Sequence, residues 1–267
     1  MKCTAAFLVL FVTSIPAFSL AQDDGPQIIV DRASPDIFPE SWRTPKINAQ
    51  AEELSAERQP QCRDLIERAL AKYPTGVLRA NLKKVYGLGS LQYSAVPTGG
   101  TNSRTAVYLV SKDRYSPTAI EEIFHAEFSS ILLRNFPHHL DSVAWQQLNP
   151  PGFHYRGSGV QAIKTQQASQ RLRAALHEEG FLNEYGKASP EEDFNSFAGR
   201  LFLGDPALWN AIEHYPKVKA KAELAIAFYH KLDATFTHPF FLSLRQPDPA
   251  GQSAKTPPQK GPDSKNN

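Results

Sequence analysis

Cysteine is scarce in this chain of 267 residues, which contains two cysteines and one methionine. Cys3 lies in a segment that we expect to be removed, so only Cys62 would remain, and a single cysteine cannot form an intramolecular disulfide. The fold must therefore depend on a hydrophobic core, and the roughly 225 residues between the expected signal and tail are enough for one sizeable domain. Cys62 lies in an amphipathic helical pattern, which favours a buried structural thiol over a reactive one.

An excess of charge of one sign is also missing. The formal net charge is +2, and acidic and basic residues are interspersed along the chain. No basic stripe with interleaved aromatic residues is present, so the sequence does not indicate a nucleic-acid partner. Beyond the first 21 residues no apolar run is long enough to cross a bilayer, and we expect no stable membrane span in the mature protein.

Residues 1–21 have the pattern of a cleavable signal peptide. Lys2 supplies the positive charge, residues 7–12 form an apolar run, and the Ser19 to Ala21 segment matches a cleavage site with small residues. The apolar run is short and is interrupted by Pro16, which argues against a permanent membrane anchor. We therefore expect an exported protein, secreted or periplasmic, with cleavage near Ala21.

The remaining chain divides by composition into three segments. Residues 22–81 are predicted to form an N-terminal extension, with a short strand-like run and a helix over residues 48–73. Residues 82–245 are predicted to form one α+β domain. Residues 246–267 are rich in Pro, Gln, Lys, Ser and Asp and contain no large apolar residue, which is typical of a disordered tail.

Strand-like patterns open the predicted α+β domain. Residues 85–91, 93–96 and 105–110 are rich in β-branched, aromatic and apolar residues, and a turn-rich stretch over residues 97–103 interrupts them. This pattern predicts a small, mainly antiparallel sheet. It directly precedes the best-defined helix of the chain.

That helix is predicted to run from Ser116 to Asn135. Ser116 offers an N-cap oxygen, and Pro117 suits the first helical position because its missing N–H is not needed there. Apolar residues recur at helical spacing and predict a broad buried face: Ile120, Ile123, Phe124, Phe128, Ile131 and Leu132.

The part after Pro137 is predicted to be mainly helical. A long connection is followed by a short helix within residues 167–179 and by a helix that begins at Ser189 with an acidic first turn. A last helix is predicted over residues 216–234. The sequence therefore predicts a sheet packed on one central helix, followed by a helical subdomain.

Two short patterns carry a chemical signature. The central helix contains His-Ala-Glu-Phe-Ser-Ser over residues 125–130, which is close to H-E-x-x-H. In that motif two histidines one turn apart bind zinc, and the glutamate activates the zinc-bound water. Farther along, Tyr185 precedes Glu192 by seven residues, and an aromatic residue follows the acidic cluster.

On these residues the chain resembles the gluzincin zinc metallopeptidases, especially the lethal-factor type of catalytic domain, over roughly residues 82–236. The resemblance implies a zincin-like α+β fold. It also implies that Glu127 is the general base, that Glu192 is the third zinc ligand and that Tyr185 stabilises the oxyanion.

The sequence departs from the family pattern at both zinc-binding histidines. Ala126 and Ser130 stand at these positions, and His125 lies one residue early, about 100° around the helix. Catalytic zinc usually needs three protein ligands. A relocated site would have to recruit imidazoles from elsewhere, and His125 with Glu192 is the pair of ligands that we consider; other candidates are His138, His139 and His154.

Each of these residues also has a purely structural interpretation. Glu127 alone would be an ordinary solvated helix residue, and acidic residues near Glu192 suit any helix N-terminus. Tyr185 could be a half-buried aromatic residue. His138 and His139 suit the end of a helix, where positive charge is favourable.

Two functional hypotheses remain open. In the first, an exported relative of zinc metallopeptidases hydrolyses peptide bonds with metal-activated water, and this activity is impaired or lost because both motif histidines are replaced. Its zinc would be held by Glu192 and a displaced histidine such as His125. In the second, the protein is a non-catalytic pseudopeptidase that binds a peptide or protein in the retained cleft.

Overall fold

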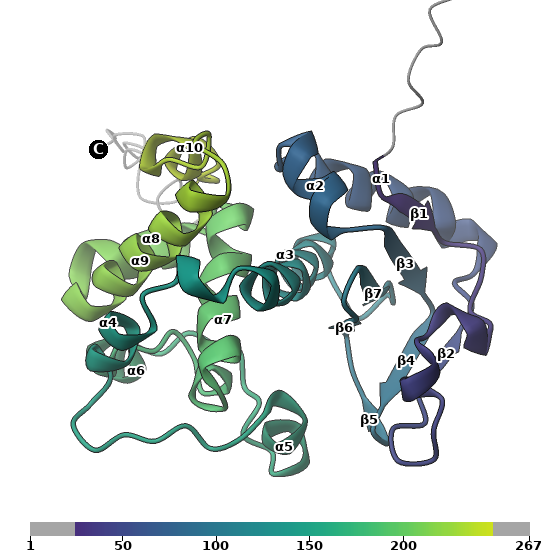
Figure 1. The fold of residues 1–267 in the computed structure, drawn as a ribbon, viewed down its shortest axis with the longest axis horizontal. Coiled ribbons are helices and arrows are strands. Elements are labelled where there is room, and N and C mark those ends of the chain that lie inside the picture. Colours follow the sequence, from purple (N-terminus) through teal and green to yellow (C-terminus); the bar gives the residue numbers. More distant parts are fainter. Residues whose placement is uncertain (1–24, 248–267) are drawn as a thin grey trace, which may run out of the picture.

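The computed structural model describes residues 25–247. The predicted signal peptide, and the predicted disordered tail from residue 248 onward, lie outside this range. The described chain is a mixed α/β structure in which two small sheets form one half and helices form the other (Figure 1). Among the described residues, no helix combines the length and apolar character required to cross a membrane.

The larger sheet has four strands in the order β1 (Gln27–Ile29), β3 (Lys84–Leu88), β7 (Ala106–Val110) and β6 (Gly100–Asn102). β1, β3 and β7 run parallel, and only the edge strand β6 is antiparallel. The prediction of a mainly antiparallel sheet is therefore wrong for this sheet. The chain between β3 and β7 is long enough for a crossover, which a parallel pair requires.

The smaller sheet is antiparallel and consists of β2 (Gln50–Glu52), β4 (Ser90–Tyr93) and β5 (Val96–Pro97). β2 lies inside the segment that was predicted as a helix from residue 48. The helix observed there, α1 (Gln59–Leu70), is shorter and is followed by α2 (Thr75–Asn81). Pairing with β4 holds β2 in the extended conformation, and this tertiary contact is not visible in the local sequence.

The side chains of β7 alternate between two hydrophobic cores, as the two-residue period of a strand requires. Val107 and Leu109 point to the face covered by α1 and α3 (Pro117–Asn135), whereas Tyr108 points to a second core on the opposite face. Cys62, on α1, is only 2% exposed, which confirms the prediction of a buried structural thiol.

The helix α3 begins and ends as predicted. The Ser116 hydroxyl accepts a hydrogen bond from the Ala119 backbone N–H at 3.1 Å and so caps the helix. The helices of the second half follow: α4 (Ser142–Gln147), α5 (Gly159–Lys164), α6 (Ala174–Glu179), α7 (Pro190–Leu203), α8 (Pro206–His214), α9 (Pro216–Leu232) and α10 (His238–Ser243). Of these, α8 and α10 were not predicted, and α4 and α5 lie in the stretch that was predicted as a long connection.

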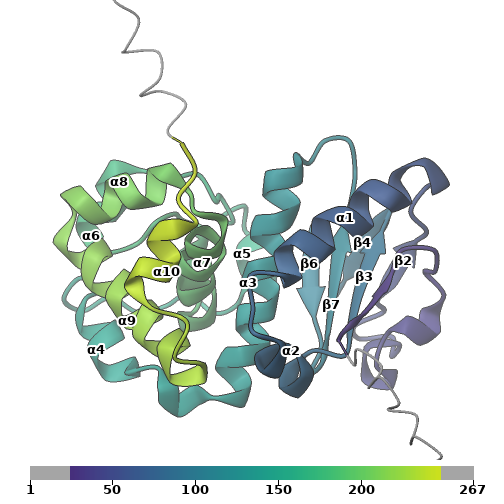
Figure 2. The same cartoon turned by 90° about the horizontal axis from the view of Figure 1, so that it is seen from above.

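Close packing of α3 against α7 joins the two halves, and Figure 2 shows α3 between the sheet and the helical half. Gly199 on α7 makes this approach possible, because a Cβ atom there would lie 3.0 Å from the Glu122 carbonyl oxygen and 3.7 Å from the Ala126 Cβ. Glu192 lies on the same α7 helix, two turns before Gly199. The packing therefore brings α7 close to the residues of α3 that carry the motif.

Candidate functional site

Glu127, Tyr185 and Glu192 come together at one hollow between the sheet edge and the helices. They line a cavity of about 240 Å³ and also an adjoining cavity of about 140 Å³. The walls come from β5, β6, α3, α5 and α7. Three residues that lie up to 65 positions apart in the sequence therefore share one site.

Glu127 is held by the edge strand. Asn102 Nδ2, on β6, donates a hydrogen bond of 2.6 Å to Glu127 Oε2. Arg134 in turn contacts the Asn102 side chain and donates to the Ser103 carbonyl oxygen at 3.1 Å. Burial raises the pKa of Glu127 to about 7, and the neighbouring Glu191 adds to this effect, whereas Asn102 and Arg134 oppose it.

Glu192 lies in the first turn of α7, on the other side of the cavity. Its backbone N–H donates to the Ser189 hydroxyl at 3.1 Å, which fixes the first turn of α7. Burial raises the pKa of the Glu192 carboxyl to about 8, and the charge of Glu127 raises it further. The two carboxyls therefore hold protons near neutral pH and repel each other when both are ionised.

Tyr185 lies beside Glu192, in a short 3-10 turn that immediately precedes α7. Burial, reinforced by the charges of Glu192 and Glu127, raises the pKa of its phenol well above the ordinary value. The hydroxyl therefore remains protonated at any physiological pH. It can donate a hydrogen bond to a ligand that enters the cavity.

Ala126 and Ser130, which align with the two histidines of H-E-x-x-H, both lie at this site. Ala126 lines the larger cavity and Ser130 lines the smaller one. Ser130 Oγ accepts a hydrogen bond of 2.7 Å from Asn195 Nδ2 on α7. The described residues that line the two cavities include no histidine or cysteine, and nowhere between residues 25 and 247 do three such side chains or carboxylates cluster as metal ligands.

The structure does not bring His125 to these cavities. Its side chain is fully buried, its Nδ1 lies 2.9 Å from the Tyr73 hydroxyl, and its ring stacks on Phe202 with the centroids 5.2 Å apart. Nε2 lies 3.6 Å from a carboxylate oxygen of Glu121. Burial lowers the pKa of His125 to about 4, so the imidazole is neutral at pH 7. The offset of one residue, about 100° around α3, accounts for this separation from Glu192.

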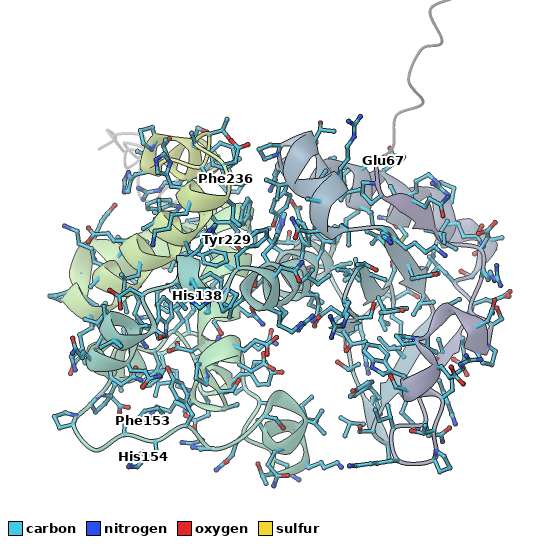
Figure 3. The ribbon with its side chains drawn as sticks, viewed as in Figure 1. Glu67, His138, Phe153, His154, Tyr229 and Phe236 are labelled. Carbon is cyan, nitrogen blue, oxygen red and sulfur yellow. The ribbon has the colours of Figure 1, made fainter. Side chains whose placement is uncertain are left out.

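The other histidines considered as ligands are also remote from the cavities. Figure 3 shows His138 on the helical half and His154 on the loop between α4 and α5. His139 stacks on Phe136 with the centroids 5.2 Å apart. None of the three is among the lining residues. His138 and His139 end a short 3-10 helix, which agrees with their structural interpretation.

Four residues of the site were missed by the sequence interpretation: Asn102, Arg134, Gly159 and Asn195. Asn102 lies in a stretch predicted as a turn, so its place on an edge strand had no local signal. Gly159 carries no side chain that could suggest a role. Asn195, three residues after Glu192, and Arg134, seven residues after Glu127, both lie in predicted helices and could have been placed on the faces of those glutamates.

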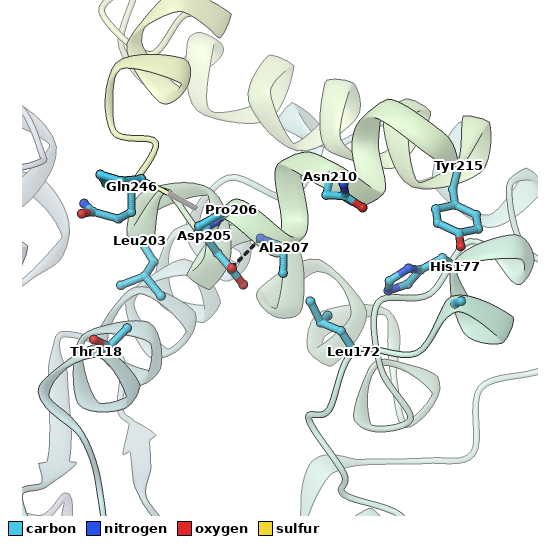
Figure 4. A pocket seen from close by; sticks show the side chains of 12 residues that line it. Thr118, Leu172, His177, Leu203, Asp205, Pro206, Ala207, Asn210, Tyr215 and Gln246 are labelled. Carbon is cyan, nitrogen blue, oxygen red and sulfur yellow. Dashed lines mark hydrogen bonds between the residues drawn. The ribbon is translucent and has the colours of Figure 1, made fainter. Parts of the chain in front are cut away.

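A larger cavity of about 740 Å³ lies elsewhere, between α6, α8 and the segment that follows α10 (Figure 4). His177 and Tyr215 form one end of it, with their ring centroids 5.1 Å apart. Asp205 is already engaged, because it accepts from the Ala207 backbone N–H at 2.9 Å and pairs with Arg200. None of the residues in the predicted site lines this cavity.

No protein-family model, curated protein or solved structure matches this chain.

Proposed function

We propose that this protein has a zincin-like fold and acts as a pseudopeptidase, which binds an extended peptide segment and does not cleave it with zinc. The observation that carries the proposal is that Glu127, Tyr185 and Glu192 line one hollow. Ala126 and Ser130 line the same hollow at the positions where H-E-x-x-H has its two histidines. The hollow thus contains the groups that would serve as general base, third zinc ligand and oxyanion donor in a zinc peptidase. Two of three zinc ligands are replaced by side chains that bind zinc poorly or not at all.

The edge strand β6 supports an extended peptide as the ligand. β6 pairs with β7 on one side and is the last strand of its sheet, so no strand within residues 25–247 pairs with its other side. An edge of this kind can add a peptide as a further strand through main-chain hydrogen bonds. Gly100 to Asn102 line the cavities, so a peptide bound along β6 would place a side chain beside Glu127 and Glu192.

The charge of the hollow defines the preferred peptide. Its lining residues include four glutamates and no lysine, arginine or histidine: Glu122, Glu127, Glu191 and Glu192. Glu122 and Glu191 are paired with Arg200 and Arg134, both at 3.1 Å, which leaves Glu127 and Glu192 without an ion-pair partner. A lysine or arginine side chain would neutralise these two carboxyls. We therefore propose peptides with a basic residue as ligands.

The test compares the binding and the cleavage of extended peptides that differ only in one central residue: lysine, glutamine or glutamate. We expect the lysine peptide to bind at least tenfold more tightly than the glutamate peptide. Its affinity should rise between pH 5 and pH 8, because both carboxyls ionise in this range. Glu192→Gln should weaken this binding, whereas Glu213→Gln, a change at a surface carboxylate, should not.

Metal content and hydrolysis decide between the hypotheses. Purified protein should contain no stoichiometric zinc and should leave the bound peptides intact. Zinc retained at one equivalent, together with hydrolysis that a chelator abolishes, would overturn the proposal in favour of an active metallopeptidase.

A second candidate function is hydrolysis without a metal. The two neighbouring carboxyls, with pKa values near 7 and 8, could act as a base and an acid, as carboxyl pairs do in other hydrolases. This function predicts peptide hydrolysis that survives a chelator and disappears in Glu127→Gln.

A further inference from the structure

Outside the candidate site, a lysine and an aspartate are completely buried together. Lys221 on α9 and Asp193 on α7 are both 0% exposed, and Lys221 Nζ lies 2.6 Å from Asp193 Oδ2. The same Nζ lies 2.8 Å from the side-chain carbonyl oxygen of Asn149, in the loop after α4. Aromatic rings enclose the amine, with Phe181 4.2 Å and Trp145 5.2 Å away.

The two carboxyl oxygens of Asp193 differ in their hydrogen bonds. Oδ2 accepts from Lys221, from Trp145 Nε1 at 2.9 Å and from the Tyr155 hydroxyl at 2.8 Å. Oδ1 is buried and has no partner. A buried carboxylate oxygen without a donor is costly, whereas the same oxygen of a neutral carboxyl carries no charge.

Burial raises the pKa of Asp193 and lowers the pKa of Lys221, and the mutual attraction of the two charges opposes both shifts. Both shifts favour a neutral acid next to a neutral amine. A neutral amine is a nucleophile, whereas an ammonium ion is not.

We propose that Lys221 and Asn149 form an intramolecular isopeptide bond, with Asp193 and Tyr155 as the groups that move the proton. The carbonyl carbon Cγ of Asn149 is one C=O bond of about 1.23 Å beyond the contacted oxygen, so it lies at most about 4 Å from Nζ. A small rotation of either side chain brings these atoms into attack distance.

Four groups form a continuous chain for the proton. Lys221 donates to Asp193, Tyr155 donates to Asp193, and Asn149 Nδ2 donates to the Tyr155 hydroxyl at 3.2 Å. The chain therefore begins at the attacking nitrogen and ends at the leaving nitrogen.

In the reaction, the lone pair of neutral Nζ forms a bond to Cγ, and the C=O electrons move to Oδ1 of Asn149. Nδ2 is now an amine that can accept a proton, so the Tyr155 hydroxyl turns to donate to it. The neutral Asp193 gives its proton, from the Oδ2 that faces Tyr155, to the tyrosine oxygen, and the carboxylate that this leaves takes one proton from the positively charged Nζ. Asp193 and Tyr155 therefore end the reaction in the states in which they began it. The carbonyl re-forms, the Cγ–Nδ2 bond breaks, and one ammonia leaves. No oxidant or other reactant is required.

The residue after Asn149 removes a competing reaction. Asparagine usually loses ammonia when the next backbone N–H attacks Cγ, but Pro150 has no N–H. Asn149 is half-buried, so ammonia has a route to solvent. The bond would join the end of α4 to α9, across 72 positions of the sequence.

Tryptic peptide mapping of the full-length protein tests the proposal directly. Trypsin does not cut at a lysine whose amine is acylated, so the map should contain peptide 135–156 joined to peptide 220–231. Its mass should be about 17 Da below the sum of the two, the mass of one ammonia. A folded wild-type protein that yields free 135–156 and complete cleavage after Lys221 would overturn the proposal.

Variants identify the reacting groups. Asn149→Ala and Lys221→Arg should abolish the joined peptide, and Lys219→Arg, two residues away on a side chain that is 60% exposed, should retain it. Tyr155→Phe should slow its formation at least tenfold after refolding. A joined peptide in folded Asn149→Ala, with the mass of one water lost, would show that Asp193 is the electrophile and would also overturn the proposal.

Discussion

Gly159 lies directly against Glu192: a Cβ atom on this glycine would fall 2.2 Å from Glu192 Oε1. The same atom would fall 2.2 Å from the Tyr185 hydroxyl oxygen. The first residue of α5 therefore has to be glycine for the carboxyl and the phenol to keep their positions. α5 comes from the long loop after α4 and contributes Val160 and Ile163 to the smaller cavity, so this helix closes one side of the site.

Replacement of this glycine should damage the site more than the fold. In Gly159→Ala, the added methyl group must displace Tyr185 or Glu192, so we expect peptide affinity to fall about tenfold, equivalent to about 1.4 kcal/mol. Titration of the lysine peptide measures this loss. Gly76→Ala on α2 is the matched control, because no atom lies within 4 Å of the position of its Cβ. Equal affinity in the two variants would contradict the assigned packing of α5.

The raised pKa of Glu192 makes stability depend on pH. The unfolded carboxyl ionises near pH 4.5, but the folded one holds its proton to about pH 8. Between these values the folded state binds more protons, so the free energy of unfolding falls as pH rises.

Glu192→Gln removes this titration. Relative to wild type, its free energy of unfolding should rise by roughly 3.5 kcal/mol between pH 5 and pH 8. Urea denaturation at the two pH values measures the change. Glu213→Gln, where the side chain is 54% exposed, should show no such trend. A Glu192→Gln difference that does not change with pH would contradict the burial of this carboxyl.

Histidines at positions 126 and 130 should create a zinc site. Ala126 and Ser130 line the cavities that also contain Glu192, so Ala126→His combined with Ser130→His supplies two imidazoles one helical turn apart and a carboxylate. We expect this double variant to bind one zinc ion, measured by metal analysis after dialysis. Adding Glu192→Gln should weaken zinc binding by at least tenfold. Failure of the folded double variant to take up zinc would count against the alignment with H-E-x-x-H.

His125 should matter for stability and not for binding. His125→Ala removes a buried ring and leaves the Tyr73 hydroxyl without its partner, which should cost about 3 kcal/mol at pH 7. Peptide affinity should remain at the wild-type level. A change in affinity as large as that caused by Glu192→Gln would show that His125 contributes to the functional site.

The depressed pKa of His125 gives this variant a characteristic pH dependence. The unfolded imidazole binds a proton near pH 6.5, but the folded one resists it until about pH 4. The wild type therefore loses stability as pH falls through this window, and the variant does not. The destabilisation caused by His125→Ala should shrink by roughly 2 kcal/mol between pH 7 and pH 4, which urea denaturation would show.

Helix α3 and the burial of Cys62 could be predicted from the sequence because they depend on local capping and helical periodicity. The parallel pairing of β3 with β7 could not, because the two strands are joined through a second sheet and their pairing depends on contacts distant in sequence. For the same reason β2 was assigned to a helix. Its strand conformation comes from β4, which lies 40 residues away.

The sequence by itself determined which chemical groups are available: Glu127 on a helix, Tyr185 seven residues before Glu192, and alanine and serine, not histidine, at positions 126 and 130. The tertiary structure alone decided where these groups lie. Close packing of α3 on α7 places these three side chains around one hollow. His125 lies two residues before Glu127 on α3, and its side chain therefore points into the core. The chemistry of each side chain depends only on the identity of its residue. The distance between these side chains depends on how helices that are distant in the chain pack together.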